Sequence, residues 1–231
     1  MSYLPCMAAA TTAATPPTFG ARLNGAASAL VARPAFWLAA IALLAVWPAV
    51  WALRAPLPPP PAVLAALPAF RLTDQDGSPF GSRELEGKVW VASFVFTRCT
   101  TVCPAVTATM ARIQDRTRNL EPAFHLVSFS VDPAFDTPAR LAAYARAHRA
   151  SPRLWTFLTG PEQAVEAAVV KGLRETMGRD GPDDGTGRGI FHGTHLVLVD
   201  ARGRVRAYYP SDAPDVVDRV VRDAALLVNR G

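Results

Sequence analysis

Two cysteines four residues apart, Cys99 and Cys103, are the side chains of this sequence best suited to chemistry. They lie in the segment FTRCTTVCP at 96–104, which follows an apolar run typical of a buried strand. Pro104 suits the first position of a helix because it has no backbone N–H to leave unpaired. Cys103 would then lie at a helix N-terminus, where the helix dipole favours the thiolate, and Arg98 would favour the thiolate of Cys99. We therefore interpret the pair as a reactive site and not as two core cysteines.

Such a pair can form a disulfide or bind a metal ion. Three residues separate Cys99 from Cys103, whereas a disulfide-exchange motif usually has two. The wider spacing still allows a disulfide, and it also allows two sulfur atoms to surround one ion. Two thiolates and one imidazole suit Cu(I), and a three-coordinate site can also hold Cu(II). A structural zinc site would need a fourth protein ligand, for which the sequence offers no obvious candidate.

The imidazole could come from His192 or His195, which belong to the segment HGTH at 192–195. His195 begins a predicted strand, whereas His192 lies in the preceding loop and would be free to swing towards the cysteines. The residue types alone do not choose between them. The other two histidines, His125 and His148, are interpreted as packing or surface residues.

The predicted elements alternate between strands and helices. The run KVWVASFVF at 88–96 is apolar on both faces, which is typical of a central strand. We interpret Asp136 as the N-cap of a helix that has Pro138 in its first turn. A glycine-rich segment at 177–189 is predicted to be a mobile loop, and DARG at 200–203 is predicted to be a hairpin turn. Further strands are predicted at 70–72, 124–131, 154–158, 195–199 and 205–209, and further helices at 104–120, 162–173 and 213–228.

This order of elements predicts an α/β fold: a thioredoxin-like mixed sheet with flanking helices. The predicted domain occupies residues 69–231. It follows a Pro-rich linker at 54–68. The polyproline stretch at 56–61 within this linker should act as a semi-rigid spacer.

A single transmembrane helix is predicted before the linker. Residues 35–53 are an apolar run of nineteen residues without a charge, with tryptophans towards both ends. A cleaved signal peptide is the alternative, but its apolar region would be shorter and the exit at Leu53-Arg54-Ala55-Pro56 is a poor cleavage site. Residues 1–34 are predicted to be a disordered tail, and Cys6 within it to be inert. Arginines flank the helix on both sides, so charge does not set its orientation.

The net charge of +5 does not indicate nucleic-acid binding. Four of the 24 basic residues precede Asp74, the first acidic residue, and the rest nearly balance the 19 acidic residues. No basic stripe with interleaved aromatic residues stands out in the predicted domain. We therefore expect no nucleic-acid partner.

Several segments together resemble the Sco/SenC family. FTRCTTVCP resembles its strand-ending F-x-x-C-x-x-x-C-P signature, SVDPAFDTP at 130–138 resembles its S-x-D-P-x-x-D-T-P, and FRLTDQDG at 70–77 resembles its F-x-L-x-D-x-x-G. The spacing from His192 to Gly203 also matches the family. The segment GTGRGIF before His192 departs from the aspartate-rich segment that the family usually has there. The resemblance covers about residues 69 to 228.

The resemblance implies a thioredoxin-like copper protein with the metal ligands Cys99, Cys103 and His192. It also implies a role in supplying copper to cytochrome c oxidase or in reducing its thiols. The expected function is a copper metallochaperone for the oxidase copper centre, and its partner is an oxidase subunit with a copper site or another copper protein. The chemistry of the cysteines places the domain in the periplasm, held by a single-pass helix in the inner membrane.

A membrane-anchored thiol–disulfide oxidoreductase that cycles Cys99 and Cys103 is the alternative, and it is compatible with copper binding because only the dithiol can bind copper. A peroxidase is disfavoured because Thr97 lies one place too close to Cys99, and a redox-inactive structural module does not explain the cysteine pair. Asp132 could tune the ionisation of the thiols or simply form a turn before a proline.

Overall fold

A computed structural model describes residues 29, 31–54, 58–181 and 185–230 of the chain. The predicted tail at 1–34 lies almost entirely outside these residues, and so does Cys6. The chain divides into two compact units, Met1–Pro58 and Pro59–Gly231.

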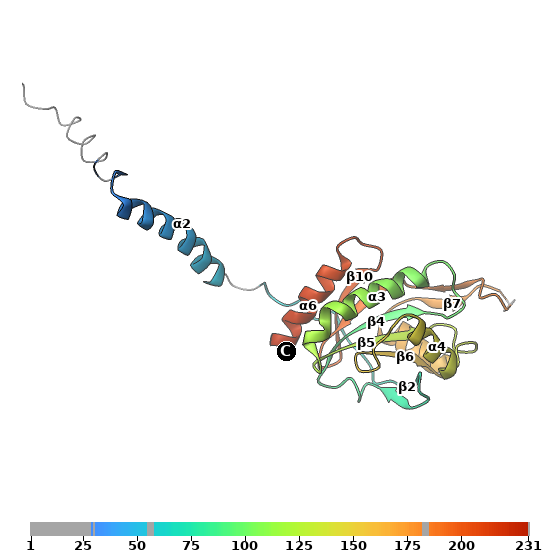
Figure 1. Ribbon diagram of the computed structural model, residues 1–231. Helices are drawn as coiled ribbons and strands as arrows, with labels where there is room; N and C mark the ends of the chain where they lie inside the picture. Colours follow the sequence, from blue (N-terminus) through green and yellow to red (C-terminus); the bar gives the residue numbers. More distant parts are fainter. Residues whose placement is uncertain (1–28, 30, 55–57, 182–184, 231) are drawn as a thin grey trace, which may run out of the picture. The chain divides into compact units, whose positions relative to one another are not determined.

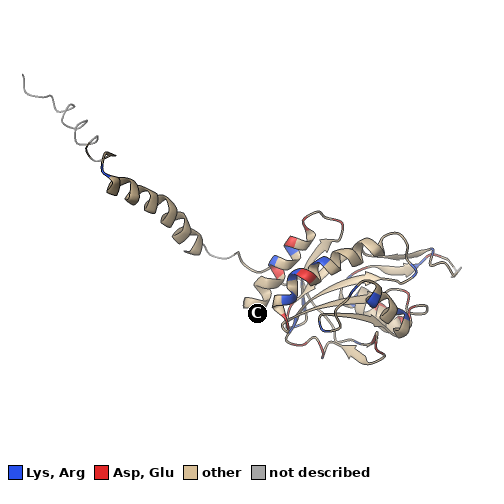
Figure 2. Ribbon diagram, viewed as in Figure 1, with Lys and Arg blue, Asp and Glu red and all other residues tan. Residues whose placement is uncertain are grey.

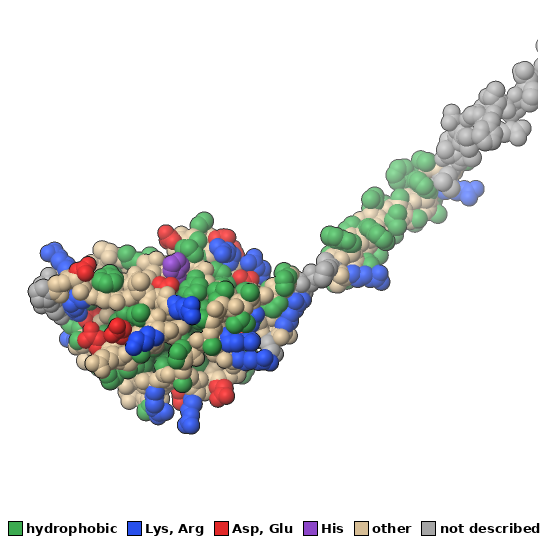
Figure 3. All heavy atoms as spheres, turned by 180° about the vertical axis from the view of Figure 1, so that it is seen from behind, with side chains coloured by type: hydrophobic (Ala, Val, Ile, Leu, Met, Phe, Trp, Pro, Cys, Tyr) green, Lys and Arg blue, Asp and Glu red, His purple; other side chains and the backbone are tan. Residues whose placement is uncertain are grey.

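The described part of the first unit is helix α2 (Pro34–Arg54), which contains Pro48 and has no buried residue. Its mean hydropathy of 2.1 over an 18-residue window and its 21 residues make it long and apolar enough to cross a membrane. Figure 3 shows hydrophobic side chains over the visible surface of this helix, between basic side chains at its two ends. This is the segment in which the transmembrane anchor is predicted.

The second unit is built around an eight-stranded mixed sheet in the order β1-β10-β9-β4-β5-β6-β2-β3. Strands β4, β5 and β6 are parallel, and the strands on either side of them, β9 and β2, run antiparallel to them. Every residue of the three parallel strands is buried, which explains their apolar sequences. The strands are β1 (Ala65–Ala66), β2 (Arg71–Asp74), β3 (Pro79–Gly81), β4 (Val89–Val95), β5 (Phe124–Ser130), β6 (Trp155–Thr159), β9 (His195–Val199) and β10 (Arg204–Pro210).

Four helical segments flank this sheet. Helices α3 and α6 lie side by side and contact β4 (Figure 1), and a 2.7 Å hydrogen bond between the hydroxyls of Thr107 and Tyr144 joins α3 to α4. Basic and acidic residues alternate along α3 and α6 (Figure 2), and Arg116 of α3 pairs with Asp218 of α6. The segments are α3 (Cys103–Thr117) with a following 3-10 turn (Arg118–Leu120), α4 (Pro138–Ala147), α5 (Glu162–Glu166) with a following π-turn (Ala167–Gly172), and α6 (Val216–Arg230). The predicted alternation of strands and helices is confirmed.

The structure corrects two of the predicted boundaries. The domain begins before residue 69, because Ala65 and Ala66 pair with β10 and the side chain of Arg206 donates to the carbonyl oxygen of Pro61 at 2.7 Å. The segment 177–189 is not wholly a loop, because its first residues form β7 (Met177–Arg179), which pairs antiparallel with β8 (Ile190–His192). We call this two-stranded element the β7–β8 ribbon.

The predicted cap of α4 is also wrong by one residue. Thr137 is the N-cap, and its Oγ1 accepts a hydrogen bond from the backbone N–H of Arg140 at 3.4 Å. Asp136 is fully buried and contacts other groups, described below. Both residue types are good caps, so the sequence pattern alone could not separate them.

Candidate metal centre

The two cysteines lie where the central strand β4 gives way to helix α3. Cys103 is the first residue of α3 and is fully buried, whereas Cys99 lies in the preceding loop and is partly exposed. The backbone N–H of Cys103 points at the Cys99 sulfur atom, with an N–Sγ distance of 3.4 Å. Both cysteines are free thiols. Pro104 is the second residue of the helix, one place after the first position predicted for it, and lies in the first turn, where its missing N–H leaves no hydrogen bond unmade.

The surroundings shift the pKa values of the two thiols in opposite directions. Burial raises the pKa of Cys103, and the neighbouring Cys99 thiol raises it further. Partial burial also opposes ionisation of Cys99, but hydrogen bonds from Cys103 and Thr101 outweigh it and lower the pKa of Cys99. Cys99 is therefore the thiol that ionises more easily.

The β7–β8 ribbon brings His192 against Cys103. The Nε2 atom of His192 lies 3.7 Å from the Cys103 sulfur atom, and Nδ1 lies 2.8 Å from the carbonyl oxygen of Gly193. A carbonyl can only accept a hydrogen bond, so Nδ1 carries the proton and the lone pair of Nε2 faces the sulfur. Burial lowers the pKa of His192, which favours this neutral imidazole. Phe96 packs against the ring edge-on, with the ring centroids 6.0 Å apart.

His195, the alternative that the sequence left open, lies in a different environment. Its Nδ1 is 3.0 Å from Oε1 of the buried Glu175, and its side chain is 45% exposed. His125 is 2.8 Å from the Thr156 hydroxyl, and His148 packs against Tyr144. Of the histidines, which all lie in the described part of the chain, His192 is the one that has a hydrogen-bond contact with a cysteine.

The three side chains have the donor atoms that a soft metal ion prefers, namely two sulfurs and one imidazole nitrogen. Within the described residues, no group of three His, Cys, Asp or Glu side chains is already gathered around a single point as a bound ion would require. The sulfur of the partly exposed Cys99 lies 3.7 Å from the Thr101 hydroxyl. The donor set therefore fits a metal ion once the side chains adjust around it.

A buried aspartate, Asp136, holds the loop before the cysteines. Its carboxylate accepts hydrogen bonds from the backbone N–H of Thr97 at 3.1 and 3.2 Å and from the Ser130 hydroxyl at 2.6 Å. Burial raises the pKa of Asp136 despite these hydrogen bonds. The loop is thus fixed to the end of β5. Sequence reasoning missed this role, although the position of Asp136 in SVDPAFDTP was a signal that could have revealed it.

Asp132 lies in the turn that was predicted for it and also pairs with two arginines. Its carbonyl oxygen accepts hydrogen bonds from the backbone N–H groups of Phe135 and Asp136. Its carboxylate lies 2.6 Å from Arg98 Nε and 2.8 Å from Arg179 Nη2. The ion pairs were not predicted.

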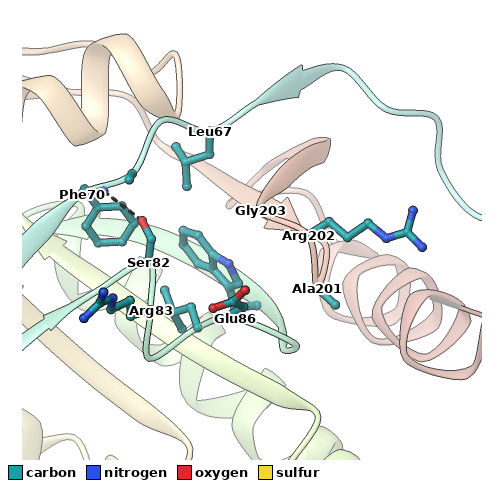
Figure 4. Close-up of a pocket in the computed structure, with 11 residues that line it drawn as sticks. Leu67, Phe70, Ser82, Arg83, Glu86, Ala201, Arg202 and Gly203 are labelled. Atoms are coloured by element: carbon teal, nitrogen blue, oxygen red, sulfur yellow. Dashed lines mark hydrogen bonds between the residues drawn. The ribbon is translucent and has the colours of Figure 1, made fainter.

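A cavity of about 480 Å³ lies at the other end of β4 (Figure 4). Trp90, near the start of β4, lines it, whereas the cysteines follow the end of that strand. The side chains of Leu67, Phe70 and Ser82 face each other across its rim, and the Ser82 hydroxyl accepts from the backbone N–H of Phe70 at 2.9 Å. Its lining residues include neither of the two cysteines nor His192, so it is separate from the candidate metal centre.

Comparison with known proteins gives one family. The family model described as SCO1/SenC matches residues 61–225. A relative from Bacillus subtilis (strain 168), described as an SCO1 protein homolog, is 31% identical over 155 residues, which are 67% of this chain and 78% of the relative.

Solved structures give the same result for the fold. BsSco, described as having a disulfide switch and as a member of the Sco family of cytochrome c oxidase assembly proteins, is similar with a TM-score of 0.63 and 27% identity over 75% of this chain and 99% of that chain. Bradyrhizobium japonicum ScoI, solved with copper bound, has a TM-score of 0.61 and 23% identity over 71% of this chain and 99% of that chain. The predicted thioredoxin-like fold, in the form that Sco proteins share, is confirmed.

Proposed function

The chain belongs to the SCO1/SenC family, and from this premise we propose that it is a copper metallochaperone that assists assembly of the copper centre of cytochrome c oxidase. The observation that carries the proposal is the 3.7 Å contact between His192 Nε2 and the Cys103 sulfur, beside Cys99. Copper is the cargo, and Cys99, Cys103 and His192 are its proposed ligands. The copper-bound relative and the oxidase assembly role of BsSco support this assignment.

The proposed chemistry is binding followed by ligand exchange. Copper binding requires both thiols as thiolates, so it releases their protons. Cys99, with its lowered pKa, would bind first, and the more deeply buried Cys103 and the neutral His192 would then complete the site. A three-coordinate site leaves room for a soft ligand of the acceptor protein to bind copper before a ligand of the chaperone leaves.

A copper titration tests the proposal. The full chain in detergent should bind one Cu(I) per molecule, measured by competition with a chelator of known affinity. Cys99→Ser, Cys103→Ser and His192→Ala should each weaken binding by at least about tenfold, because each removes one ligand. His195→Ala is the matched control and should bind like the wild type. Stoichiometric binding of unchanged affinity in Cys99→Ser/His192→Ala would refute the proposed site.

A second candidate function is thiol–disulfide exchange. The observation that favours it is the unequal pair of free thiols, an ionisable and partly exposed Cys99 next to a buried Cys103. Such a pair can attack a partner disulfide through the first thiolate and then release the partner by closing an internal disulfide.

Metal-free redox measurements separate this function from copper transfer. The reduction potential of the pair and its rate of disulfide reduction are measured without copper, in the wild type and in His192→Ala. An oxidoreductase should keep its rate in His192→Ala. A pair that does not exchange with any model disulfide leaves the metallochaperone as the function.

We further propose that α2 anchors the chain in the inner membrane as a single-pass helix, with the copper domain in the periplasm. The length and hydropathy of α2 and the oxidisable dithiol support this arrangement. The proposed partner is an oxidase subunit with a copper site in the same membrane. Cell fractionation tests the anchor, and reporter fusions after residue 231 test the side. A chain released by carbonate, or a reporter active only in the cytoplasm, would contradict the arrangement.

A further inference from the structure

We propose that Asp132 is a positioning residue that joins the two segments carrying the proposed copper ligands. One of its carboxylate oxygens binds the cysteine loop through Arg98, and the other binds the β7–β8 ribbon through Arg179. The inference rests on the proposed function, because it concerns the same site. We call the three residues Arg98, Asp132 and Arg179 the aspartate clamp.

The first half of the clamp holds the cysteine loop. Arg98 is adjacent to Cys99, and its Nε lies 2.6 Å from Oδ2 of Asp132. The Arg98 side chain is 8% exposed and the Asp132 side chain is fully buried. The Arg98 guanidinium also lies 4.5 Å from the centroid of the Phe135 ring. A charge-assisted hydrogen bond between such buried groups is strong and fixes the geometry of both partners.

The second half holds the ribbon. Arg179 lies on β7, and its Nη2 is 2.8 Å from Oδ1 of Asp132. In the ribbon, Arg179 pairs with Ile190 and Met177 pairs with His192, so the position of β7 determines that of His192. Among the described residues, the ribbon forms a two-stranded sheet of its own, separate from the eight-stranded sheet.

A backbone contact supports the same connection. Gly187, in the loop of the ribbon, has φ +78°, and a Cβ atom there would lie 3.0 Å from Cγ of Arg98. The chain before His192 therefore passes directly over the arginine that pairs with Asp132. Because Asp132 is buried and bonded to both segments, loss of its charge should release the ribbon and move His192 away from the cysteines.

The chain offers a matched control in Asp200. This aspartate is 5% exposed and its carboxylate also binds two arginines, Arg204 and Arg206, at 2.8 Å. It belongs to the turn between β9 and β10, and its carboxylate accepts hydrogen bonds from Arg202, Arg204 and Arg206 of that hairpin. Asp132→Asn and Asp200→Asn thus remove the same charge from the same kind of buried cluster, but only the first acts on the ribbon.

The experiment compares full-length variants in detergent by two measurements. In the first, without metal, amide hydrogen exchange is followed by mass spectrometry in peptides covering 177–193, where the N–H of Gly193 donates to Thr176 and that of Asp180 to Gly189. In the second, Cu(I) affinity is measured by chelator competition. Asp132→Asn should exchange faster in this segment and bind Cu(I) about 10–100-fold more weakly. Asp200→Asn should match the wild type in both.

A double-mutant comparison shows whether Asp132 acts through His192. In the His192→Ala background, Arg179→Gln should cause no further loss of Cu(I) affinity, because the ribbon no longer supplies a ligand. Arg179→Gln is used because its partly exposed side chain makes a folded variant available even where Asp132→Asn does not fold. Equal, additive losses in both backgrounds, or wild-type exchange in Asp132→Asn and Arg179→Gln, would overturn the inference. If His192→Ala binds Cu(I) normally, the proposed ligand set fails, and hydrogen exchange still decides whether the clamp holds the ribbon.

Discussion

Burial makes the two cysteines chemically unequal, although they lie only four residues apart. Cys103 is enclosed at the start of α3, whereas Cys99 is partly exposed and has its pKa lowered by hydrogen bonds. A partner disulfide therefore reaches the Cys99 sulfur more easily than the Cys103 sulfur. The neutral His192, with Nδ1 bound to the Gly193 carbonyl, presents its lone pair to the buried sulfur. At the scale of residues, the site combines an accessible thiol, Cys99, with two enclosed side chains, Cys103 and His192, that are proposed as ligands.

The buried histidine His125 predicts how stability depends on pH. Burial, with a smaller effect of Lys88, lowers its pKa from 6.5 to about 4. Between these values the unfolded chain binds a proton that the folded chain does not, so the free energy of unfolding falls as pH falls from 6.5 to 4. The loss from this residue is up to ~3 kcal/mol, at ~1.4 kcal/mol per pKa unit.

Urea unfolding of the wild type and His125→Gln at several pH values between 4.5 and 7 measures this contribution. Glutamine can still reach the Thr156 hydroxyl, which His125 Nε2 approaches to 2.8 Å, but it does not titrate. The difference in unfolding free energy between the two proteins should shrink or reverse as pH falls. A difference independent of pH would show that His125 does not become charged on unfolding.

The elements differ in how well the sequence predicts them. Strand β4 and helix α3 follow from an apolar run and from Pro104, because burial on both faces and a helix start both leave local signals. The β7–β8 ribbon leaves no such signal. Its strands contain Gly178 and His192, and the ring of Phe191 lies so close to Gly178 that a Cβ there would be 2.5 Å from Cζ. Contacts across the ribbon and with Asp132 form it, and a local pattern cannot show them.

Long-range contacts also decide which histidine belongs to the candidate site, and a local sequence pattern does not show them. Cys99 and Cys103 could be singled out from their spacing, but the choice of His192 over His195 depended on resemblance. The structure separates the two histidines by their partners, a cysteine for His192 and Glu175 for His195. Those partners come from distant parts of the chain, so spacing alone could not reveal them.

Gly193 allows Glu175 and His192 to occupy neighbouring positions, and this predicts the effect of Gly193→Ala. A Cβ at this position would lie 1.4 Å from Oε2 and 2.7 Å from Cδ of Glu175. The carboxylate must move, which breaks its 3.0 Å contact with His195. We expect Gly193→Ala to lower the free energy of unfolding by about 1–3 kcal/mol, as overpacking of a filled site does.

Urea unfolding checks this value. Gly160→Ala is the comparison and should cost less, because a Cβ there would lie 3.1 Å from the Leu72 Cδ2 atom, which needs to shift by only a few tenths of an ångström. Gly193→Ala/Glu175→Ala removes the collision and should recover part of the loss. If the double variant were no more stable than Gly193→Ala, the collision with Glu175 would not be the cause.

At the scale of the molecule, the described residues form an apolar helix and a domain whose sheet includes part of the expected linker. The chain joins the domain at Pro61, whose carbonyl binds Arg206, and then adds β1 to the edge of the sheet beside β10. Leu67 packs closely over Gly172, where a Cβ would lie 2.6 Å from Cδ1 of Leu67. The second half of the predicted linker is therefore part of the folded domain and is not a free spacer.

Two truncations test where the folded unit begins. A chain of residues 59–231 should fold as a soluble domain and bind copper like the full chain, because it keeps all of the second compact unit. A chain of residues 69–231 loses β1 and Leu67 and leaves Arg206 without the Pro61 carbonyl. Its melting temperature should be several degrees lower than that of the 59–231 chain. A loss of ~1 kcal/mol in the free energy of unfolding corresponds to about 2–8 °C for domains of this size range. Equal melting temperatures would place the start of the domain at residue 69.

The hydrogen bond that holds Pro61 to the sheet also sets the length of the free segment between α2 and the domain. Only seven peptide steps separate Arg54, the end of α2, from Pro61, and a fully extended chain spans at most ~3.6 Å per residue. Pro61 can thus lie no more than about 25 Å from the end of α2. A short segment raises the effective concentration of the domain for targets within reach and excludes targets beyond it. If α2 spans a membrane as proposed, this length limits how far from the bilayer an acceptor could lie, and lengthening the segment before Pro61 would widen the range of acceptors while diluting each encounter.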